Sequence, residues 1–189
     1  MIALSKDQQR KMETLHTELA QILHKHYTEA LGHIIDVEIA FVDQTTLGEI
    51  IISFNNPCVA YPCRLEPLGG PALIEYNVHV ANAFLEQELG HKTEAALTPE
   101  EAAVMAKVHA RDVQETQAVW QSLEPITISD AELVTDKEAI LPELTRNNPC
   151  ILIAFEINGQ HFSGLTYWVY PNYTLESVLP KLDAWTPPK

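Results

Sequence analysis

Basic residues are scarce in this sequence of 189 residues: 12 lysines and arginines stand against 26 aspartates and glutamates, giving a net charge of −14. The acidic residues are scattered along the chain rather than gathered in one tail. A surface of this sign repels phosphate backbones and anionic lipids, which argues against nucleic acid and membrane surfaces as partners. It is compatible with a basic protein partner.

Long hydrophobic runs are also missing. The chain becomes charged at once, at Lys6 and Asp7, which leaves no apolar stretch of signal-peptide length. The longest apolar runs, such as residues 151–155, are far too short to span a bilayer. Because 46% of the residues are hydrophobic, the chain can still bury a core. We therefore expect a soluble intracellular protein without membrane insertion.

Residues that typically bind metals show no suitable spacing. Cys58, Cys63 and Cys150 lack the pattern of a zinc site, and we expect them to be buried, reduced thiols. The eight histidines include no pair four residues apart, the spacing that a helical metal site needs. We therefore expect no metal site, and we interpret His109 as a core histidine rather than a ligand.

Motifs for nucleophilic catalysis and phosphate binding are absent from the sequence. Gly-x-Ser-x-Gly does not occur. The pair Gly69-Gly70 is followed by Pro71 and a predicted strand, whereas a phosphate-binding loop must open a helix. We therefore expect no catalytic residues, no cofactor and no enzymatic activity.

The sequence does contain an internal repeat. Asn-Asn-Pro-Cys at residues 55–58 recurs at residues 147–150, an offset of 92. Further matching residues lie 94 apart, so a two-residue insertion separates the blocks: Gly70 and Gly164, Tyr76 and Tyr170, Leu85 and Leu179. The repeat predicts a duplicated structural unit.

The first unit predicts a helix, a strand, a short helix, two strands and a helix. The first helix runs from a cap at Ser5 to about Leu31, is closed by Gly32, and buries Met12, Leu15, Leu19, Ile22, Leu23 and Ala30. The next strand shows alternation, with an inward face formed by Val37, Ile39 and Phe41. The later elements are predicted as a helix at 43–53, strands at 59–65 and 72–76, and a helix at 78–89 that Asn77 caps and Gly90 ends.

The second unit repeats this order. Thr98, Pro99 and Glu101 form a capping box with proline at the first helical position, and the inward residues of this helix are Ala102, Met105, Ala106, Val113 and Trp120. A strand is predicted at 126–133 and a short helix at 136–144. Strands at 151–157 and 165–170 form a hairpin around Asn158-Gly159, and a last helix covers 175–182.

These elements predict an α/β fold in which a helix-strand-helix-strand-strand-helix unit occurs twice, with pseudo-two-fold symmetry around a central sheet. Each unit has a hydrophobic sheet face that long helices must cover, so neither is stable alone. The connection at about residues 90–97 is too short for a flexible linker. We expect residues 1–189 to form a single domain with internal repeats at about 6–90 and 98–183.

Several segments resemble the middle domain of the FliM family of flagellar motor switch proteins. Residues 66–74 resemble the family's "pL.G.all" segment, and Leu97-Thr98-x-x-Glu101 resembles its "lT.iE" helix start. The helix that follows ends near Trp120, where the family also has a tryptophan. Residues 155–182 are similar to the pattern "fev..g...G.l.icyPy..lepi...L". The match is colinear over about residues 12–183.

The resemblance implies a CheC-like fold and a non-enzymatic scaffold in the cytoplasmic ring of the flagellar rotor, where the family serves rotor assembly, switching and chemotaxis. It implies a cytoplasmic protein, peripheral at the flagellar basal body if it works in a rotor. The implied partners are a FliG-like rotor protein, neighbouring copies of itself and a FliN-like protein. The family's glycine-rich docking loop for FliG corresponds here to a shorter connection, formed by Leu89, Gly90, His91, Lys92 and Thr93.

Two other functions stay open. A divergent FliM/CheC-like paralogue that serves another assembly is favoured by the shortened loop, in which Gly90 can simply close a helix. A CheC-like phosphatase needs a Glu-x-x-Asn pair, and none of the eight asparagines has a glutamate three residues before it.

The family also carries segments outside this domain. Its N-terminal peptide for phosphorylated CheY has only a faint counterpart at Leu4-Ser5-Lys6-Asp7, and no FliN-like domain follows before Lys189. A truncated chain and a free-standing paralogue both remain open on this point.

Overall fold

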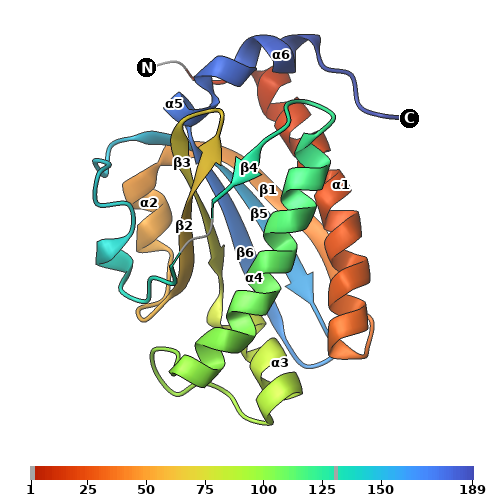
Figure 1. Cartoon of the computed structure of the whole chain (residues 1–189), viewed down its shortest axis with the longest axis vertical. Helices are drawn as coiled ribbons and strands as arrows, with labels where there is room; N and C mark the ends of the chain where they lie inside the picture. The colour runs from red at the N-terminus through yellow and green to blue at the C-terminus, as the bar shows by residue number, and fades with distance from the viewer. Residues whose placement is uncertain (1–2, 130–131) are drawn as a thin grey trace.

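The alternating and apolar segments of the sequence pair into one antiparallel sheet, with helices on both of its faces (Figure 1). The computed structural model describes residues 3–129 and 132–189. The strand order is β1-β5-β6-β3-β2-β4, formed by β1 (Asp36–Thr46), β2 (Val59–Glu66), β3 (Gly70–Tyr76), β4 (Thr127–Ile128), β5 (Pro149–Asn158) and β6 (Ser163–Pro171). The predicted α/β class with a central sheet is confirmed.

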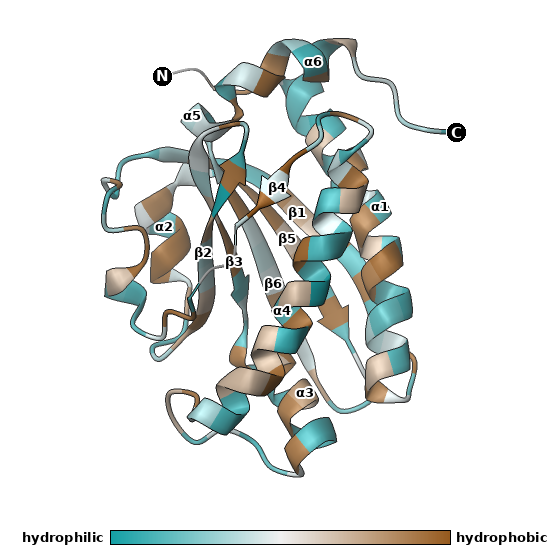
Figure 2. Ribbon diagram, in the orientation of Figure 1, coloured by the Kyte–Doolittle hydropathy of each residue, from teal (hydrophilic) through white to brown (hydrophobic). Residues whose placement is uncertain are grey.

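Long helices cover one face of the sheet and short ones cover the other. The first face carries α1 (Lys6–Leu31), α3 (Val78–Leu89) and α4 (Pro99–Trp120), above a large core cluster. The second face is covered by α2 (Leu47–Ile52) and by the segment around the 3-10 helix η1 (Lys137–Ala139), over a smaller cluster. In Figure 2, α1 and α4 alternate between hydrophilic and hydrophobic residues, as helices with one buried face do.

The chain ends in short helical turns beside its beginning. These are α5 (Asn172–Leu175), η2 (Glu176–Val178) and α6 (Leu179–Ala184), where a single helix at 175–182 was predicted. The Lys11 ammonium on α1 donates hydrogen bonds to the carbonyls of Leu182 and Asp183 in α6. Among the helices of the described residues, none is long and apolar enough to cross a membrane.

The order of strands is symmetric between the two halves of the chain. The equivalent strands of the two halves are β1 and β4, β2 and β5, and β3 and β6. Exchanging each strand with its equivalent turns the order β1-β5-β6-β3-β2-β4 into the same order read from the other edge of the sheet. Each half contributes one strand that pairs with a strand of the other half, since β1 pairs with β5 and β4 pairs with β2. The two Asn-Asn-Pro-Cys segments lie at the starts of the equivalent strands β2 and β5. This is the arrangement that a pseudo-two-fold duplication produces.

The predicted helix ends are confirmed where local capping decides them. Ser5 caps α1 in a full capping box with Gln8, and Gly32 ends it in the left-handed conformation at φ 73°. At the start of α4 the Thr98 hydroxyl accepts the Glu101 N–H, as expected. The Glu101 carboxylate, however, meets the Thr98 hydroxyl at 3.1 Å rather than a backbone N–H, so this capping box is incomplete.

The predicted inward face of β1 is wrong at Phe41. A β-bulge between Ile39 and Phe41 shifts the alternation by one residue, so Phe41 turns to the opposite face and contacts the Tyr167 ring. Its side chain stays 44% exposed. The strand then continues to Thr46, and the helix predicted at 43–53 begins only at Leu47.

The connection after α4 is less regular than predicted. Only Thr127 and Ile128 of the strand predicted at 126–133 form strand pairs, with β2, and residues 130–131 lie outside the described part of the chain. The helix predicted at 136–144 is reduced to the three residues of η1. The hairpin of β5 and β6 is confirmed, but Asn158 pairs with Ser163, so its loop is 159–162 rather than a tight Asn-Gly turn.

Candidate functional site

The predicted docking loop follows the end of α3. Gly90 has φ 76°, and its N–H donates to the Glu86 carbonyl at 3.0 Å, which closes the helix in the left-handed conformation. Leu89 is half-buried and packs against the main core. The helix-closing function of Gly90 is therefore confirmed, whereas a binding role of the loop stays a prediction.

The rest of this loop is tied back to α3 and leaves two side chains free to meet solvent. The Thr93 N–H donates to the Asn82 side chain at 2.9 Å, and the Thr93 hydroxyl donates to the Ala95 carbonyl. His91 and Lys92 are exposed, with the Lys92 ammonium 3.9 Å from the Glu86 carboxylate. The loop thus has an anchored end and an accessible imidazole and ammonium.

A groove of about 570 Å³ runs along the side of α3 beside this loop. It brings Lys92 together with three histidines from separate parts of the chain: His33 after α1, His79 in α3 and His161 in the β5–β6 loop. Among the described residues, no group of three or more His, Cys, Asp or Glu side chains is arranged to hold a metal ion. The imidazoles and the Lys92 ammonium that line the groove can form hydrogen bonds with a partner surface.

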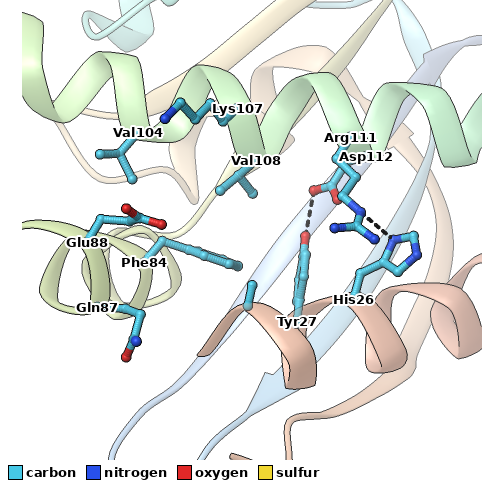
Figure 3. A pocket seen from close by; sticks show the side chains of 11 residues that line it. His26, Tyr27, Phe84, Gln87, Glu88, Val104, Lys107, Val108, Arg111 and Asp112 are labelled. Carbon is cyan, nitrogen blue, oxygen red and sulfur yellow. Dashed lines mark hydrogen bonds between the residues drawn. The ribbon is translucent and has the colours of Figure 1, made fainter. Parts of the chain in front are cut away.

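On its other side, α3 borders a smaller pocket of about 200 Å³ between α1, α3 and α4. Figure 3 shows Tyr27, Asp112, Arg111 and His26 together at one end, and Val104, Lys107, Phe84 and Glu88 at the other. Gln87 lines both this pocket and the groove. The helix α3 is therefore flanked by two hollows.

Asp112 forms the centre of a buried hydrogen-bond network beneath this pocket. The Tyr27 hydroxyl donates to its Oδ2 at 2.5 Å and the Tyr76 hydroxyl donates to the same oxygen at 2.7 Å. Burial raises the pKa of Asp112 to about 7, although the two tyrosines and Arg111 act in the opposite direction. Thr116 continues the network, because it donates to the Asp112 carbonyl and accepts from the Trp168 indole.

The sequence did not predict that α4 buries polar and charged residues. Ala106, predicted to face inward, is exposed, and Ala102 and Val113 are only half-buried. Apart from the adjacent pair at its end, the residues that α4 buries are spaced by three or four and include charged types: Glu101, Met105, His109, Asp112, Thr116, Val119 and Trp120. The spacing is present in the sequence, but hydropathy alone assigns such polar residues to the solvent side. Ala30 on α1, also predicted inward, is exposed and lines the pocket.

Other candidate chemical groups are buried core residues. His16 is buried between the Met12 carbonyl and the Tyr170 hydroxyl, and burial lowers its pKa to about 4. His109 is buried and stacks on the Tyr61 ring at 4.0 Å, as expected of a core histidine. The three cysteines are buried and unpaired, and burial raises the pKa of each thiol to about 11 or 12. Raised thiol pKa values make these cysteines poor nucleophiles.

Comparison with known proteins identifies the family. The sequence profile described as "FliM: Flagellar motor switch protein FliM" matches residues 5–186. The flagellar motor switch protein FliM of Bacillus subtilis (strain 168) is 23% identical over 188 residues, which is 97% of this chain and 56% of that protein. The chain thus spans about half the length of the curated relatives that it matches.

Solved structures show the same fold. FliM in the FliM–SpeE complex of H. pylori superposes with a TM-score of 0.90 at 22% identity, covering 97% of this chain and 98% of that chain. FliM in the FliG–FliM complex of H. pylori gives 0.86 at 22% identity, with 94% and 100% covered. A CheC-like superfamily protein from Shewanella gives 0.55 at 8% identity, with 88% and 99% covered, which confirms the predicted CheC-like fold. Since the family profile matches nearly its whole length, the chain belongs to the FliM family.

Proposed function

We propose that this chain is a scaffold of the flagellar motor switch, which works by holding neighbouring proteins in place rather than by catalysis. The single observation that carries the proposal is the family match over residues 5–186, on a fold that superposes on FliM with a TM-score of 0.90. Scaffolds of this kind need complementary surfaces and no reactive groups. The place of work is the cytoplasmic side of the flagellar basal body, with the chain bound peripherally.

The proposed main partner is a FliG-like rotor protein. FliM of H. pylori forms a complex with FliG, which supports this choice for a chain of the same fold. The proposed contact is the loop formed by Leu89, Gly90, His91, Lys92 and Thr93, because His91 and Lys92 are exposed while Thr93 anchors the loop on α3. Copies of the same chain and a FliN-like protein are the further proposed partners.

The experiment measures binding of the purified chain to the FliG homologue of its own cell. We expect the double substitution His91→Glu and Lys92→Glu to weaken binding at least tenfold, about 1.4 kcal/mol. Lys25→Glu, at an exposed position of α1, is the matched control and leaves binding unchanged. Unchanged binding of the double variant would place the contact elsewhere, and no binding by the wild-type chain would reject a FliG-like partner.

A non-enzymatic role makes a separate prediction. The Glu-x-x-Asn pair of CheC-like phosphatases is absent from the sequence, so the pair that anchors the partner and positions water is missing. We expect no acceleration when the chain is added to phosphorylated CheY. An acceleration of tenfold or more, about 1.4 kcal/mol of barrier, would contradict the scaffold.

A divergent paralogue that serves another assembly is the second candidate. The short connection between Gly90 and Thr98, in place of a glycine-rich loop, favours it. Capture of partners from the native cell separates the two candidates, because only the motor scaffold retains FliG or FliN homologues.

A further inference from the structure

The pocket between α1, α3 and α4 has a mixed lining. Phe84 of α3 and Val104 and Val108 of α4 supply its apolar surface, charged side chains such as Glu88 and Lys107 lie beside them, and Asp112 forms the floor at one end (Figure 3). Its volume of about 200 Å³ is below the roughly 300–1,000 Å³ of sites for drug-sized ligands. An occupant must therefore be a small molecule with a short apolar body.

The floor offers one carboxyl oxygen that the protein itself leaves open. Both tyrosine hydroxyls donate to Oδ2 of Asp112, so Oδ1 receives neither of these bonds. In the part of the chain that the structure describes, Oδ1 accepts no other side-chain hydrogen bond, although Asp112 is only 1% exposed and lines the pocket. A carboxyl group buried to this degree is stabilised in its ionised form by hydrogen-bond donors, here the two tyrosine hydroxyls, and by a cation close to it.

Two basic side chains, Arg111 and Lys107, line the same pocket. The Arg111 Nε donates to His26 Nδ1 at 3.0 Å, and its guanidinium lies 3.9 Å from the Glu29 carboxylate. Lys107, five residues before Asp112 on α4, lies at the opposite end of the pocket with Glu88 (Figure 3). Among the described residues neither base forms an ion pair with Asp112, although the Arg111 charge lowers the pKa of this carboxyl from a longer distance. The place of a directly bonded cation therefore stays open at Oδ1.

We propose that this pocket binds a small primary ammonium compound with a short apolar stem. The ammonium group donates a hydrogen bond to the Asp112 carboxylate, and the stem packs against Phe84 and Val108. The rings of Tyr27 and Phe84, 5.1 Å apart and nearly perpendicular, supply aromatic surface that attracts a cation. This site is independent of the proposed partner contact at residues 89–93.

The charge of Asp112 makes this binding depend on pH. Its pKa of about 7 means that the ionised share falls roughly tenfold from pH 8 to pH 6. The other groups that face the carboxyl are Tyr27, Tyr76, Arg111 and Glu115, and burial raises the pKa of both tyrosines so that they remain donors. His26, whose Nδ1 accepts a hydrogen bond from Arg111 Nε, lies at the same end of the pocket.

Calorimetric titration with three ligands of the same size tests the polarity of the site: benzylammonium, benzyl alcohol and benzoate. We expect benzylammonium to bind at pH 8 at least tenfold more tightly than either of the others, and to lose about tenfold in affinity at pH 6. Equal affinity for benzyl alcohol, tighter binding of benzoate, or no measurable binding of benzylammonium overturns the proposal.

Two variants locate the site. Asp112→Asn removes the charge, and we expect it to abolish the preference for benzylammonium and its pH dependence, with folding checked by circular dichroism. Val108→Phe fills the pocket without changing the carboxyl, and we expect it to abolish binding. This variant still tests the site if Asp112→Asn does not fold. Val113→Phe, half-buried on the same helix but outside the pocket lining, is the matched control and retains binding. Wild-type affinity in the Val108→Phe variant overturns the proposal.

The variant His26→Gln tests whether the pH dependence belongs to Asp112 or to the imidazole that lies at the same end of the pocket. We expect it to keep most of the loss in affinity between pH 8 and pH 6, because Asp112 remains. A pH dependence that disappears in His26→Gln contradicts the assignment to the carboxylate.

Discussion

The hydroxyl of Tyr27 donates a 2.5 Å hydrogen bond to the carboxyl group of Asp112, which lies 85 residues later in the chain. The bond joins α1 to α4 across the core, and Tyr76 adds a second donor from β3. One carboxyl group thus fixes the relative position of both long helices and the central sheet.

The Tyr27→Phe variant tests the stabilising effect of this bond. We expect it to lower the free energy of unfolding by about 1–3 kcal/mol, because the buried Asp112 carboxyl loses one of its two tyrosine hydrogen-bond donors. Tyr61→Phe is the control. The Tyr61 hydroxyl is buried and has no hydrogen-bond partner among the described residues, so its removal is neutral or stabilising. Equal losses in both variants, measured by urea unfolding, would show that the lost hydroxyl volume rather than the bond matters.

Because Glu75 on β3 is buried, we expect the free energy of unfolding to fall as pH rises. Burial raises its pKa to about 8, so the folded state keeps a proton that the unfolded state releases from about pH 4.5 upward. Its contribution is fully present below about pH 4.5 and is lost as pH rises to about 8. We expect Glu75→Gln to reduce this fall, and Glu38→Gln, at an exposed position of β1, to leave it unchanged. Urea unfolding at pH 5, 6.5 and 8 measures the slope, and an identical slope in Glu75→Gln contradicts the prediction.

His16 predicts the opposite dependence on the acid side. Burial lowers its pKa to about 4, so the unfolded state takes up a proton before the folded state does as pH falls below about 6.5. Stability from this group is therefore lost between about pH 6.5 and pH 4. We expect His16→Gln to unfold more readily at pH 7, because the bond to the Tyr170 hydroxyl is perturbed, yet to lose less stability on acidification. A steeper acid loss in the variant would falsify this assignment.

The end of α3 predicts a clear difference between neighbouring positions. Gly90→Ala places a side chain at φ 76°, and we expect a cost of about 1–2 kcal/mol. The exposed pair changed by His91→Glu and Lys92→Glu alters stability by about 0.5 kcal/mol or less. Thermal unfolding measures both. A large loss of stability in the double variant would mean that its effect on partner binding reports folding instead of contact.

The single domain that we expect from the sequence, with repeats at about 6–90 and 98–183, predicts that neither half folds alone. Each half needs the other for a strand partner, because β1 pairs with β5 and β4 with β2. We expect fragments 1–97 and 98–189 to be unfolded separately and to regain strand signal by circular dichroism when mixed. A cooperative thermal transition in either fragment alone would contradict the interlocked domain.

Elements defined by local signals could be predicted from the sequence. The helices α1 and α3 carry a polar cap at one end and a left-handed glycine at the other, so their bounds follow from neighbouring residues. In contrast, β4 exists only where Leu65 and Glu66 of β2 pair with it, which no local pattern encodes. The face of β1 was predicted wrongly beyond Ile39 because a bulge adds one residue without a sequence signal of its own.

The candidate site was predictable only in part. Gly90 and the exposed loop follow from helix-ending rules and a family resemblance. The Asp112 network does not, because its donors come from α1 and β3 and become neighbours only in the folded chain. From the sequence alone, a carboxyl group in the middle of a helix is predicted to be solvent-exposed, because its tyrosine partners are not evident.

The pairing of β1 with β5 also fixes when this protein can fold during its synthesis. Asp36 pairs with Asn158, and among the strands of the described residues β1, at the edge of the sheet, pairs with β5 alone. A ribosome must therefore release most of the chain before the first strand finds its place, and α1 meanwhile has only part of its packing surface. Pairings this distant in sequence are slow to form and expose apolar surface while they wait. The nascent chain therefore keeps apolar surface exposed until β5, the partner of β1, has been synthesised.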